Sequence, residues 1–352
     1  MANKLQSLIA TAIIFLSTQA TYADNRVKAV QQKLLELGYQ PGVADGIWGT
    51  NSEAALNQFL SSKGLTFDGK IDTNEFELLE IFSFRYNIDE SLPAAWVNEF
   101  KNIIGILQEL LPIDKNFNEY VKNSTMDIYA WNGKVKNPFS EKRGMSGASI
   151  SGDGRTRWMV LEIPKNEFKY DSLHRYSVIV HEYFHVYQIG LSKDRMDPKW
   201  LNEGGAKVLE EMFVQQYYGR SSLEGDLKRR SLWSDEVFTD PNLYEKFETS
   251  SKETLDGYMD MNYAGSAFML LTLVKELQKD NISEQESFEL VFKDFWLEKA
   301  GQRNWQKAFE KTFNISVKTF YDRLSGYSRK DVNKILPQKS LKIQDIFDCV
   351  IK

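Results

Sequence analysis

The sequence predicts an α+β protein that is mainly α, with a small three-helix bundle followed by a larger domain that combines a small β-sheet with helices. Three short amphipathic stretches lie within the first 80 residues, two strand-like runs follow in the middle of the chain, and helical spacing dominates after Pro164. At 352 residues, 42% of them apolar, the chain is long enough for two packed cores.

Residues 1–23 have the layout of a cleavable export signal. Lys4 precedes an apolar run from Leu8 to Leu16, and small and polar residues follow up to Ala23. A run of roughly nine residues is too short to span a membrane, so we expect no membrane span and a location in the periplasm, the cell envelope or outside the cell. The formal net charge of −5 argues against nucleic acid as a partner. A single cysteine excludes an internal disulfide.

The bundle is predicted from three helical stretches in about 55 residues. The first helix covers residues 26–38 and ends at a glycine. After a glycine-rich loop, Asn51 or Ser52 is expected to cap a second helix that runs through Phe59. A third helix is expected near residues 73–79.

The order of residues in this bundle resembles the peptidoglycan-binding module found at the ends of many cell-wall enzymes. The resemblance covers residues 26–80 and implies a wall-binding domain at residues 24–85, with peptidoglycan as partner. Ser52 stands where the family prefers threonine, and Leu60 stands where it usually has glutamine. The matching segments are Val27-Lys28-Ala29-Val30-Gln31, Leu35-Glu36-Leu37-Gly38-Tyr39, Asp45-Gly46-Ile47-Trp48-Gly49, Ala54-Ala55, Phe59, Gly64-Leu65 and Asp68-Gly69.

Tyr39, Asp45 and Trp48 are the candidate peptidoglycan-binding residues. The two aromatic rings offer flat faces to a sugar or a stem peptide, but a core this small also needs its large apolar side chains for packing. Asp45 precedes a glycine, where an aspartate commonly bonds its own backbone in a turn. Both the binding and the structural interpretation stay open at this point.

The entry to the second domain is predicted near residue 90. Residues 84–115 carry apolar side chains at helical spacing, so we expect one long helix there. The runs at residues 126–131 and 157–164 are typical of strands. Residues 144–154 are rich in glycine and serine and are expected to form a loop between the strands.

The stretch His181-Glu182-Tyr183-Phe184-His185 is a His-Glu-x-x-His motif. It lies in a predicted helix that Asp171 or Ser172 can cap and that ends at about Leu191. Histidines four positions apart share one helix face, and two imidazoles at that spacing can bind one Zn²⁺. Glu182 can then take a proton from water activated by the metal and pass it to the leaving amine.

Glu203 is the candidate third metal ligand. It lies eighteen positions after the second histidine, at the start of another helical stretch. Asp194 and Asp197 also offer carboxylates, yet neither stands in a recognisable motif. The metzincin pattern is excluded, because Gln188 and Leu191 occupy the positions where it needs glycine and histidine.

The motif and the phrase Trp-Leu-Asn-Glu-Gly around Glu203 resemble the gluzincin metallopeptidases, most closely the peptidase-MA-like group. The resemblance covers roughly residues 120–325 and implies a catalytic domain at residues 90–330. In this family the glutamate of that phrase completes the zinc site. The resemblance therefore implies one Zn²⁺ per chain, held by His181, His185 and Glu203.

Gluzincins of this kind use a tyrosine of a later helix to stabilise the oxyanion, and the segment from Asn262 to Phe268 resembles that helix. Tyr263 is the candidate catalytic tyrosine, with Tyr258 as the alternative. An ordinary helical role for Tyr263 stays open. His174 shares a face with the motif, but a surface or supporting role is expected, because two histidines, a glutamate and water already complete a zinc site.

The aminopeptidase branch of the family carries a Gly-x-Met-Glu-Asn phrase upstream of the motif, and residues 147–151 lack it. The resemblance therefore implies an endopeptidase. We expect the strand at residues 157–163 to form an edge that pairs with an extended substrate.

The sequence thus predicts an exported zinc metallopeptidase, held on peptidoglycan, that hydrolyses a peptide or protein substrate. Residues 331–352 are expected to form a C-terminal tail. One alternative is a non-catalytic wall-binding scaffold that retains its zinc site. Another is a prodomain role for the bundle, which would act sterically, because residues 24–90 contain no cysteine to occupy the metal.

Overall fold

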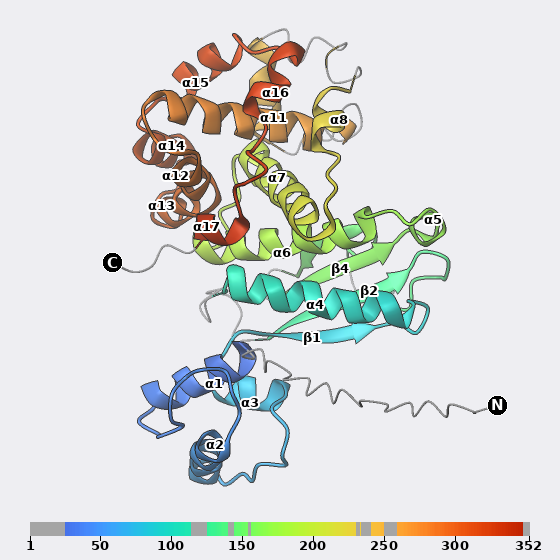
Figure 1. Ribbon diagram of the computed structural model, residues 1–352, viewed down its shortest axis with the longest axis vertical. Helices are drawn as coiled ribbons and strands as arrows, with labels where there is room; N and C mark the ends of the chain where they lie inside the picture. The colour runs from blue at the N-terminus through green and yellow to red at the C-terminus, as the bar shows by residue number, and fades with distance from the viewer. Residues whose placement is uncertain are drawn as a thin grey trace, which may run out of the picture. The chain divides into compact units, whose positions relative to one another are not determined.

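The computed structural model describes residues 25–113, 125–139, 144–153, 156–229, 233, 241–249 and 259–347. The export signal, Tyr258 and Cys349 lie outside the described residues. Two compact units, divided after Gly69, make up the chain (Figure 1). Helices hold 59% of the residues and strands 9%, which confirms the mainly helical α+β class. Within the described residues, no helix is both long enough and apolar enough to cross a membrane.

The N-terminal unit contains α1 (Asn25–Glu36) and α2 (Thr50–Ser62). The predicted side-chain cap from Asn51 or Ser52 is wrong, because α2 begins directly after Gly49 and both residues lie inside its first turn. The apolar faces of the two helices form a small core, to which Val30, Leu34, Leu56, Phe59 and Leu60 contribute.

A buried glutamine, Gln31, braces the loop between α1 and α2. Its Oε1 accepts a hydrogen bond from the backbone N–H of Gly46 at 2.9 Å, and its Nε2 donates to Oγ of Ser52 at 2.9 Å. The Ser52 hydroxyl in turn donates to the carbonyl of Pro41 at 3.1 Å. A buried amide satisfied on both sides fixes this loop to both helices.

The third short helix, α3 (Thr73–Leu78), belongs by its contacts to the second unit. A capping box formed by Asp72 and Glu75 closes its N-terminus. Oδ1 of Asp72 accepts the backbone N–H of Asn74 at 2.8 Å, and Oε2 of Glu75 accepts the backbone N–H of Asp72 at 2.9 Å. The helix packs against β1 (Ser83–Ile88) and β2 (Thr125–Asn132). The second unit therefore begins before its first strand.

One long helix over residues 84–115 is a wrong prediction, because the segment splits into β1 and α4 (Ala94–Leu110). Phe84, Tyr86 and Ile88 alternate with polar residues, which suits a strand. Pro93 then takes the N-cap position of α4. The apolar residues at helical spacing lie in α4, so the helical pattern does not hold for the residues of β1.

The sheet has the strand order β1-β2-β4-β3, in which β3 covers Ala148–Gly152 and β4 covers Arg157–Ile163. The first three strands in this order are parallel, and β3 runs antiparallel to β4. Two predictions are therefore wrong: residues 144–154 contain a strand, and β4 is central rather than an edge. Serine and glycine have a low intrinsic strand preference, so pairing with β4 decides the structure of β3.

The two faces of the sheet bury different clusters. Residues at every second position of β2 and β4 pack with α4 and α6 in the main core, namely Met126, Ile128, Ala130, Met159, Leu161 and Ile163. The alternate positions join a smaller cluster on the other face, which comprises Tyr129, Trp131, Met145, Trp158 and Val160. This period of two is the geometry of a strand buried on both faces.

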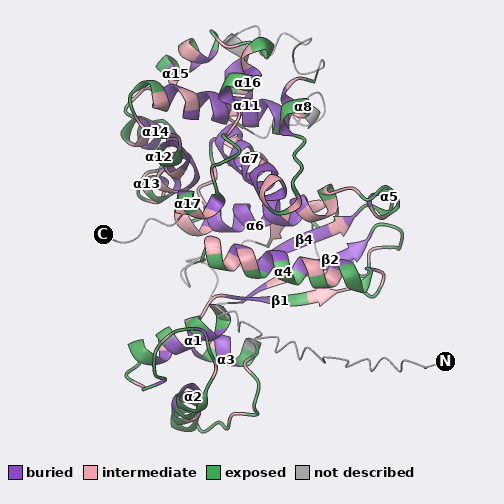
Figure 2. Ribbon diagram, viewed as in Figure 1, coloured by how far each residue is buried: buried purple, intermediate pink, exposed green. Residues whose placement is uncertain are grey.

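Helices build the rest of the second unit, and buried residues concentrate in α6, α7 and α11 (Figure 2). The α6 helix begins after Leu173, not after a side-chain cap from Asp171 or Ser172 as predicted, although Oγ of Ser172 accepts the N–H of His174. The helical segments are α5 (Lys165–Lys169), α6 (His174–Ser192), α7 (Lys199–Tyr218), α8 (Leu223–Leu227), η1 (Pro241–Phe247), α11 (Met259–Lys279), α12 (Glu284–Glu289), η2 (Leu290–Asp294), α13 (Phe295–Gly301), α14 (Trp305–Phe313), α15 (Val317–Leu324), η3 (Arg329–Asp331), α16 (Val332–Ile335) and α17 (Ile343–Phe347).

The segment expected to be a C-terminal tail folds, as far as it is described, into η3, α16 and α17. Ile343 and Ile346 of α17 are buried. The Phe347 ring packs edge-on against Tyr187 of α6 at 5.9 Å and stacks on Phe292 at 6.1 Å. Part of the apolar surface of α6 is therefore buried by α17.

Candidate metal centre and active site

Three buried side chains from two neighbouring helices converge on one point. His181 and His185 lie one turn apart on α6, with ring centroids 4.8 Å apart. Glu203 comes from the first turns of α7, which packs along α6. Its Oε2 lies 3.3 Å from Nε2 of His181 and 3.5 Å from Nε2 of His185. The structure thus brings together the three residues predicted as metal ligands.

The geometry of this cluster fits a zinc ion. Ligand atoms bound tetrahedrally to zinc at its usual bond lengths lie about 3.3 Å apart, close to the two separations measured between Glu203 and the histidines. One carboxylate and two imidazoles also form a donor set that zinc accepts in catalytic sites, with a position left over. Of the described residues, these three form the group able to hold a metal ion.

The outer nitrogen of His181 is held by a carboxylate. Its Nδ1 lies 3.1 Å from Oε2 of Glu210, and the other oxygen of Glu210 accepts from Nζ of Lys207 at 2.8 Å. Burial opposes ionisation of Glu210, but Lys207 and His181 lower the pKa of Glu210 to about 2. Burial also lowers the pKa of His181, yet its hydrogen bonds to Glu203 and Glu210 raise this pKa to about 10 in the metal-free protein. A metal at Nε2 would replace that proton.

The outer nitrogen of His185 is held by an amide instead. Oε1 of Gln188 lies 2.9 Å from Nδ1 of His185 and accepts from Nδ2 of Asn202 at 2.8 Å. Nε2 of Gln188 donates to the carbonyl of Asn202, which fixes the orientation of the amide. Nδ2 of Asn202 also lies 3.1 Å from this Nδ1. The amide oxygen of Gln188 favours a proton on Nδ1, a tautomer that would leave Nε2 available to a metal beside Glu203.

Glu182, the predicted general base, is buried beside the two histidines. Its Oε2 has no hydrogen-bond partner among the described residues. Burial raises the pKa of Glu182 above the usual range of a glutamate, and the neighbouring histidines counteract part of that effect. A buried carboxylate oxygen without a partner is costly, and such a group is typical of a functional site.

Two glycines after Glu203 explain the close packing around the site. A Cβ on Gly204 would lie 2.4 Å from the backbone oxygen of Ser266 in α11, and a Cβ on Gly205 would lie 2.9 Å from the Phe184 ring. Glycine therefore lets the backbones of α7 and α11 approach each other directly. This approach carries Tyr263, near the start of α11, to the candidate metal ligands.

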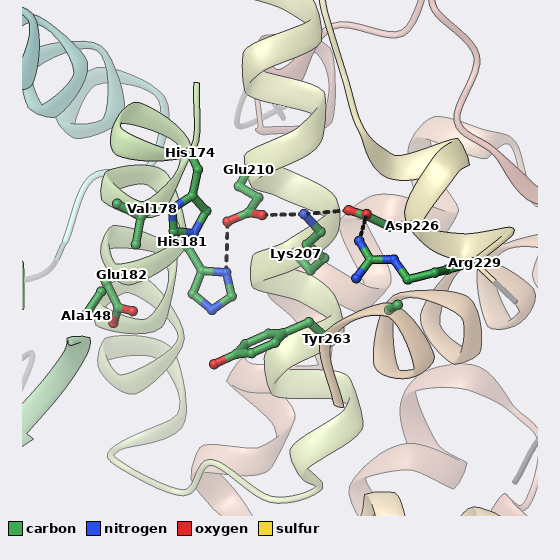
Figure 3. A pocket seen from close by; sticks show the side chains of 11 residues that line it. Ala148, His174, Val178, His181, Glu182, Lys207, Glu210, Asp226, Arg229 and Tyr263 are labelled. Atoms are coloured by element: carbon green, nitrogen blue, oxygen red, sulfur yellow. Dashed lines mark hydrogen bonds and ion pairs between the residues drawn. The ribbon is translucent and has the colours of Figure 1, made fainter. Parts of the chain in front are cut away.

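The Tyr263 ring lies edge-on to His181, with centroids 5.6 Å apart, and 47% of the residue is exposed. Burial and the nearby carboxylates raise the pKa of Tyr263, so its hydroxyl is a proton-bearing donor. Tyr263, His181 and Glu182 line one cavity of about 320 Å³ (Figure 3). Ala148 of the edge strand β3 also lines it.

A chain of charged side chains forms the far wall of this cavity (Figure 3). It runs from Glu210 to Lys207, from Lys207 to Asp226 at 3.3 Å, and from Asp226 to Arg229 at 2.5 Å. His174 lines the same cavity, but its Nδ1 pairs with Glu167 at 2.7 Å and not with the candidate metal ligands. The supporting role expected for His174 fits this position.

The two alternative carboxylates are engaged elsewhere. Asp194 forms an ion pair with Arg157 at the start of β4. Asp197 lies 3.0 Å from the buried ammonium of Lys299 in α13. Glu203 is therefore the acidic residue that reaches both histidines.

In the N-terminal unit, the candidate wall-binding residues are half-buried or exposed. The Tyr39 ring meets Phe59 edge-on at 5.9 Å, and the Trp48 ring lies 6.0 Å from Phe67. Oδ1 of Asp45 accepts the backbone N–H of Ile47 at 2.9 Å, which is the turn interaction that the sequence offered as one alternative.

Four supporting residues were not predicted as part of a site: Gln31 in the N-terminal unit and Gln188, Lys199 and Glu210 in the second. Lys199 is one of them because its Nζ donates to Oε1 of Glu203 at 3.0 Å. Each has a sequence signal. Gln31 interrupts the apolar face of the first helix, four positions after Val27. The other three lie at helical spacing from a ligand, three positions after His185, four before Glu203 and seven after it.

Residues 23–79 match the family model described as "Putative peptidoglycan binding domain". The N-terminal part of the chain is thus a peptidoglycan-binding domain, as the sequence predicted. This match includes α3, although that helix packs with the second unit. No curated protein and no solved structure matches the chain.

Proposed function

We propose that this protein is an exported zinc metallopeptidase, and more specifically an endopeptidase. Its N-terminal domain would hold the enzyme on peptidoglycan. The observation that carries the proposal is the convergence of His181, His185 and Glu203 on one point, beside a buried glutamate with an unpartnered oxygen. Zinc, when bound there, supplies a Lewis acid that lowers the pKa of water and polarises a carbonyl.

The residues of the chain have separate tasks in this reaction. Glu182 accepts a proton from the attacking water and delivers it to the leaving amine, a role for which a raised pKa suits a carboxylate. The Tyr263 hydroxyl donates a hydrogen bond to the carbonyl oxygen as negative charge develops there. Glu210 and Gln188 hold the two imidazoles so that each presents Nε2.

The edge strand β3 supports an extended substrate. Among the described strands, β3 pairs on one side only, with β4, and Ala148 at its start lines the cavity beside Glu182. A peptide added to this edge would place its backbone along the floor of the site, with main-chain hydrogen bonds that are independent of its sequence. This edge takes the role expected for the strand at residues 157–163.

The first experiment measures hydrolysis of casein and of purified sacculi by the wild type and by Glu182→Gln, with the zinc content of both. Activity in the wild type that disappears in a zinc-loaded Glu182→Gln variant supports the proposal and identifies the substrate class. Zinc without activity in the wild type would overturn it in favour of a wall-binding scaffold.

The role of the N-terminal unit is tested by deleting residues 24–69. A deletion to residue 90 would also remove α3 and β1, which pack within the second unit. Targeting predicts unchanged hydrolysis of a soluble peptide with loss of sacculus binding. An increase in peptide hydrolysis would instead identify the unit as a steric prodomain.

A further inference from the structure

We infer that Lys199 is a positioning residue of the metal centre, which holds one oxygen of Glu203 so that only the other oxygen faces the two histidines. The inference rests on the proposed function, because it takes Glu203 to be a metal ligand. It assigns a role to a side chain that neither the His-Glu-x-x-His motif nor the Trp-Leu-Asn-Glu-Gly phrase includes.

The two carboxylate oxygens of Glu203 have different partners. Oε1 accepts from Nζ of Lys199 at 3.0 Å. Oε2 lies 3.3 Å and 3.5 Å from the Nε2 atoms of His181 and His185. The side chain of Glu203 is 11% exposed and that of Lys199 is 22% exposed, so water competes little for this ion pair.

Helix stability alone does not account for a lysine at this position. Lys199 is the first residue of α7, directly after the N-cap Pro198, and the helix dipole disfavours a cation there. A lysine four residues before a glutamate is also the weaker order of an ion pair along a helix. The backbone of the first turn is held independently, because the N–H of Lys199 donates to the carbonyl of Glu248 at 2.9 Å.

The consequence concerns the number of ligand atoms. A carboxylate that binds a metal through one oxygen leaves a position open for water or substrate, as catalytic zinc sites require. If its outer oxygen were released, Glu203 could turn and present both oxygens. Lys199 therefore preserves the open position and fixes the orientation in which Glu203 meets the metal.

The test compares zinc binding in the full-length protein with Lys199→Met, Lys199→Arg and Lys165→Met. Lys165 is a matched control, because it is also the first residue of a helix behind a proline N-cap, and it is exposed. Competition with a chelator gives the zinc affinity, and X-ray absorption at the zinc edge gives the ligand number. Thermal unfolding of the metal-free proteins checks that each variant folds, and Lys199→Gln replaces Lys199→Met if the latter does not.

We expect Lys199→Met to weaken zinc binding roughly 10-fold to 100-fold and to raise the number of ligand atoms, with recovery in Lys199→Arg and no change in Lys165→Met. In a Glu203→Ala background, Lys199→Met should have no further effect on affinity, because the oxygen that accepts from Lys199 is already lost. The inference would be overturned if Lys199→Met left zinc affinity and ligand number unchanged. It would also be overturned if Lys199→Met lowered zinc affinity equally in the presence and in the absence of Glu203.

Failure of the proposed function is visible separately in the same measurements. A wild type that binds no zinc, or a Glu203→Gln variant that binds zinc as tightly as the wild type, contradicts the metal centre itself. The role of Lys199 alone is contradicted if the wild type binds zinc through Glu203 and Lys199→Met has the same zinc affinity and ligand number as the wild type.

Discussion

Nδ1 of His181 lies 3.1 Å from Oε2 of Glu210, so a carboxylate of α7 fixes the imidazole of α6. The pair is buried on both sides, and Lys207 keeps Glu210 ionised. An ionised carboxylate both orients an imidazole and increases its basicity towards a metal.

Replacement of Glu210 by alanine should therefore weaken zinc binding about 10-fold to 100-fold, because His181 loses its orientation and Lys207 loses a partner. Glu210→Gln should weaken it less, since the amide oxygen still accepts from Nδ1. Chelator competition measures both. Glu224→Gln, on the exposed surface of α8, is the control and should bind zinc as the wild type does. Equal affinity of Glu210→Ala and the wild type would remove Glu210 from the centre.

Tyr263→Phe should lower kcat on the order of 10²-fold while KM changes little, because the hydroxyl acts on charge that develops only during the reaction. Zinc content should stay at the wild-type level. Tyr170→Phe is the control, since Tyr170 is 69% exposed in the connection between α5 and α6. A Tyr263→Phe variant with wild-type kcat would leave Tyr263 an ordinary residue of α11.

Gly204→Ala should destabilise the protein by about 1–3 kcal/mol or more, because the added Cβ meets the backbone of Ser266 and neither helix can yield locally. Gly105→Ala in α4 is the matched control. Its added Cβ meets nothing within 4 Å, so alanine should stabilise that helix by up to about 1 kcal/mol. Urea unfolding measures both changes. Similar values for the two variants would contradict the close approach of α7 and α11.

His174 gives the stability of the protein a pH dependence. Its hydrogen bond to Glu167 raises the pKa of His174 above the ordinary value, against the effect of burial, with Glu210 and Lys207 as further charged neighbours. Stabilisation by a raised pKa is complete below the unfolded-state pKa and disappears as the pH rises through the folded-state pKa. His174→Gln should therefore reduce the free energy of unfolding more at about pH 6 than at about pH 9. An equal reduction at both values would exclude a charged His174–Glu167 pair.

That the candidate ligands lie close together was predictable because part of their geometry is local. Four positions along one helix place His181 and His185 on one face, whatever surrounds them. The prediction of Glu203 also required the Trp-Leu-Asn-Glu-Gly phrase around it, because spacing alone does not distinguish Glu203 from Asp194 and Asp197. The structure separates them, because Arg157 and Lys299 pair with the two aspartates.

The parts that were not predicted depend on distant contacts. The strand β3 exists because β4 pairs with it, and its serines and glycines gave no local signal. Glu210 and Gln188 lie at helical spacing from the ligands, but so do many residues of any helix. Only the packing of α6 on α7 selects the side chains that reach an imidazole.

The packing of α17 on α6 sets an order of events during synthesis. The chain emerges from its N-terminus, so α6 is complete long before Phe347 exists to contact Tyr187 and Phe292. Until then, the apolar side of the helix that carries both histidines lacks part of its cover. In a nascent chain, the helix that carries both candidate histidines would therefore be incompletely packed until α17 is in place.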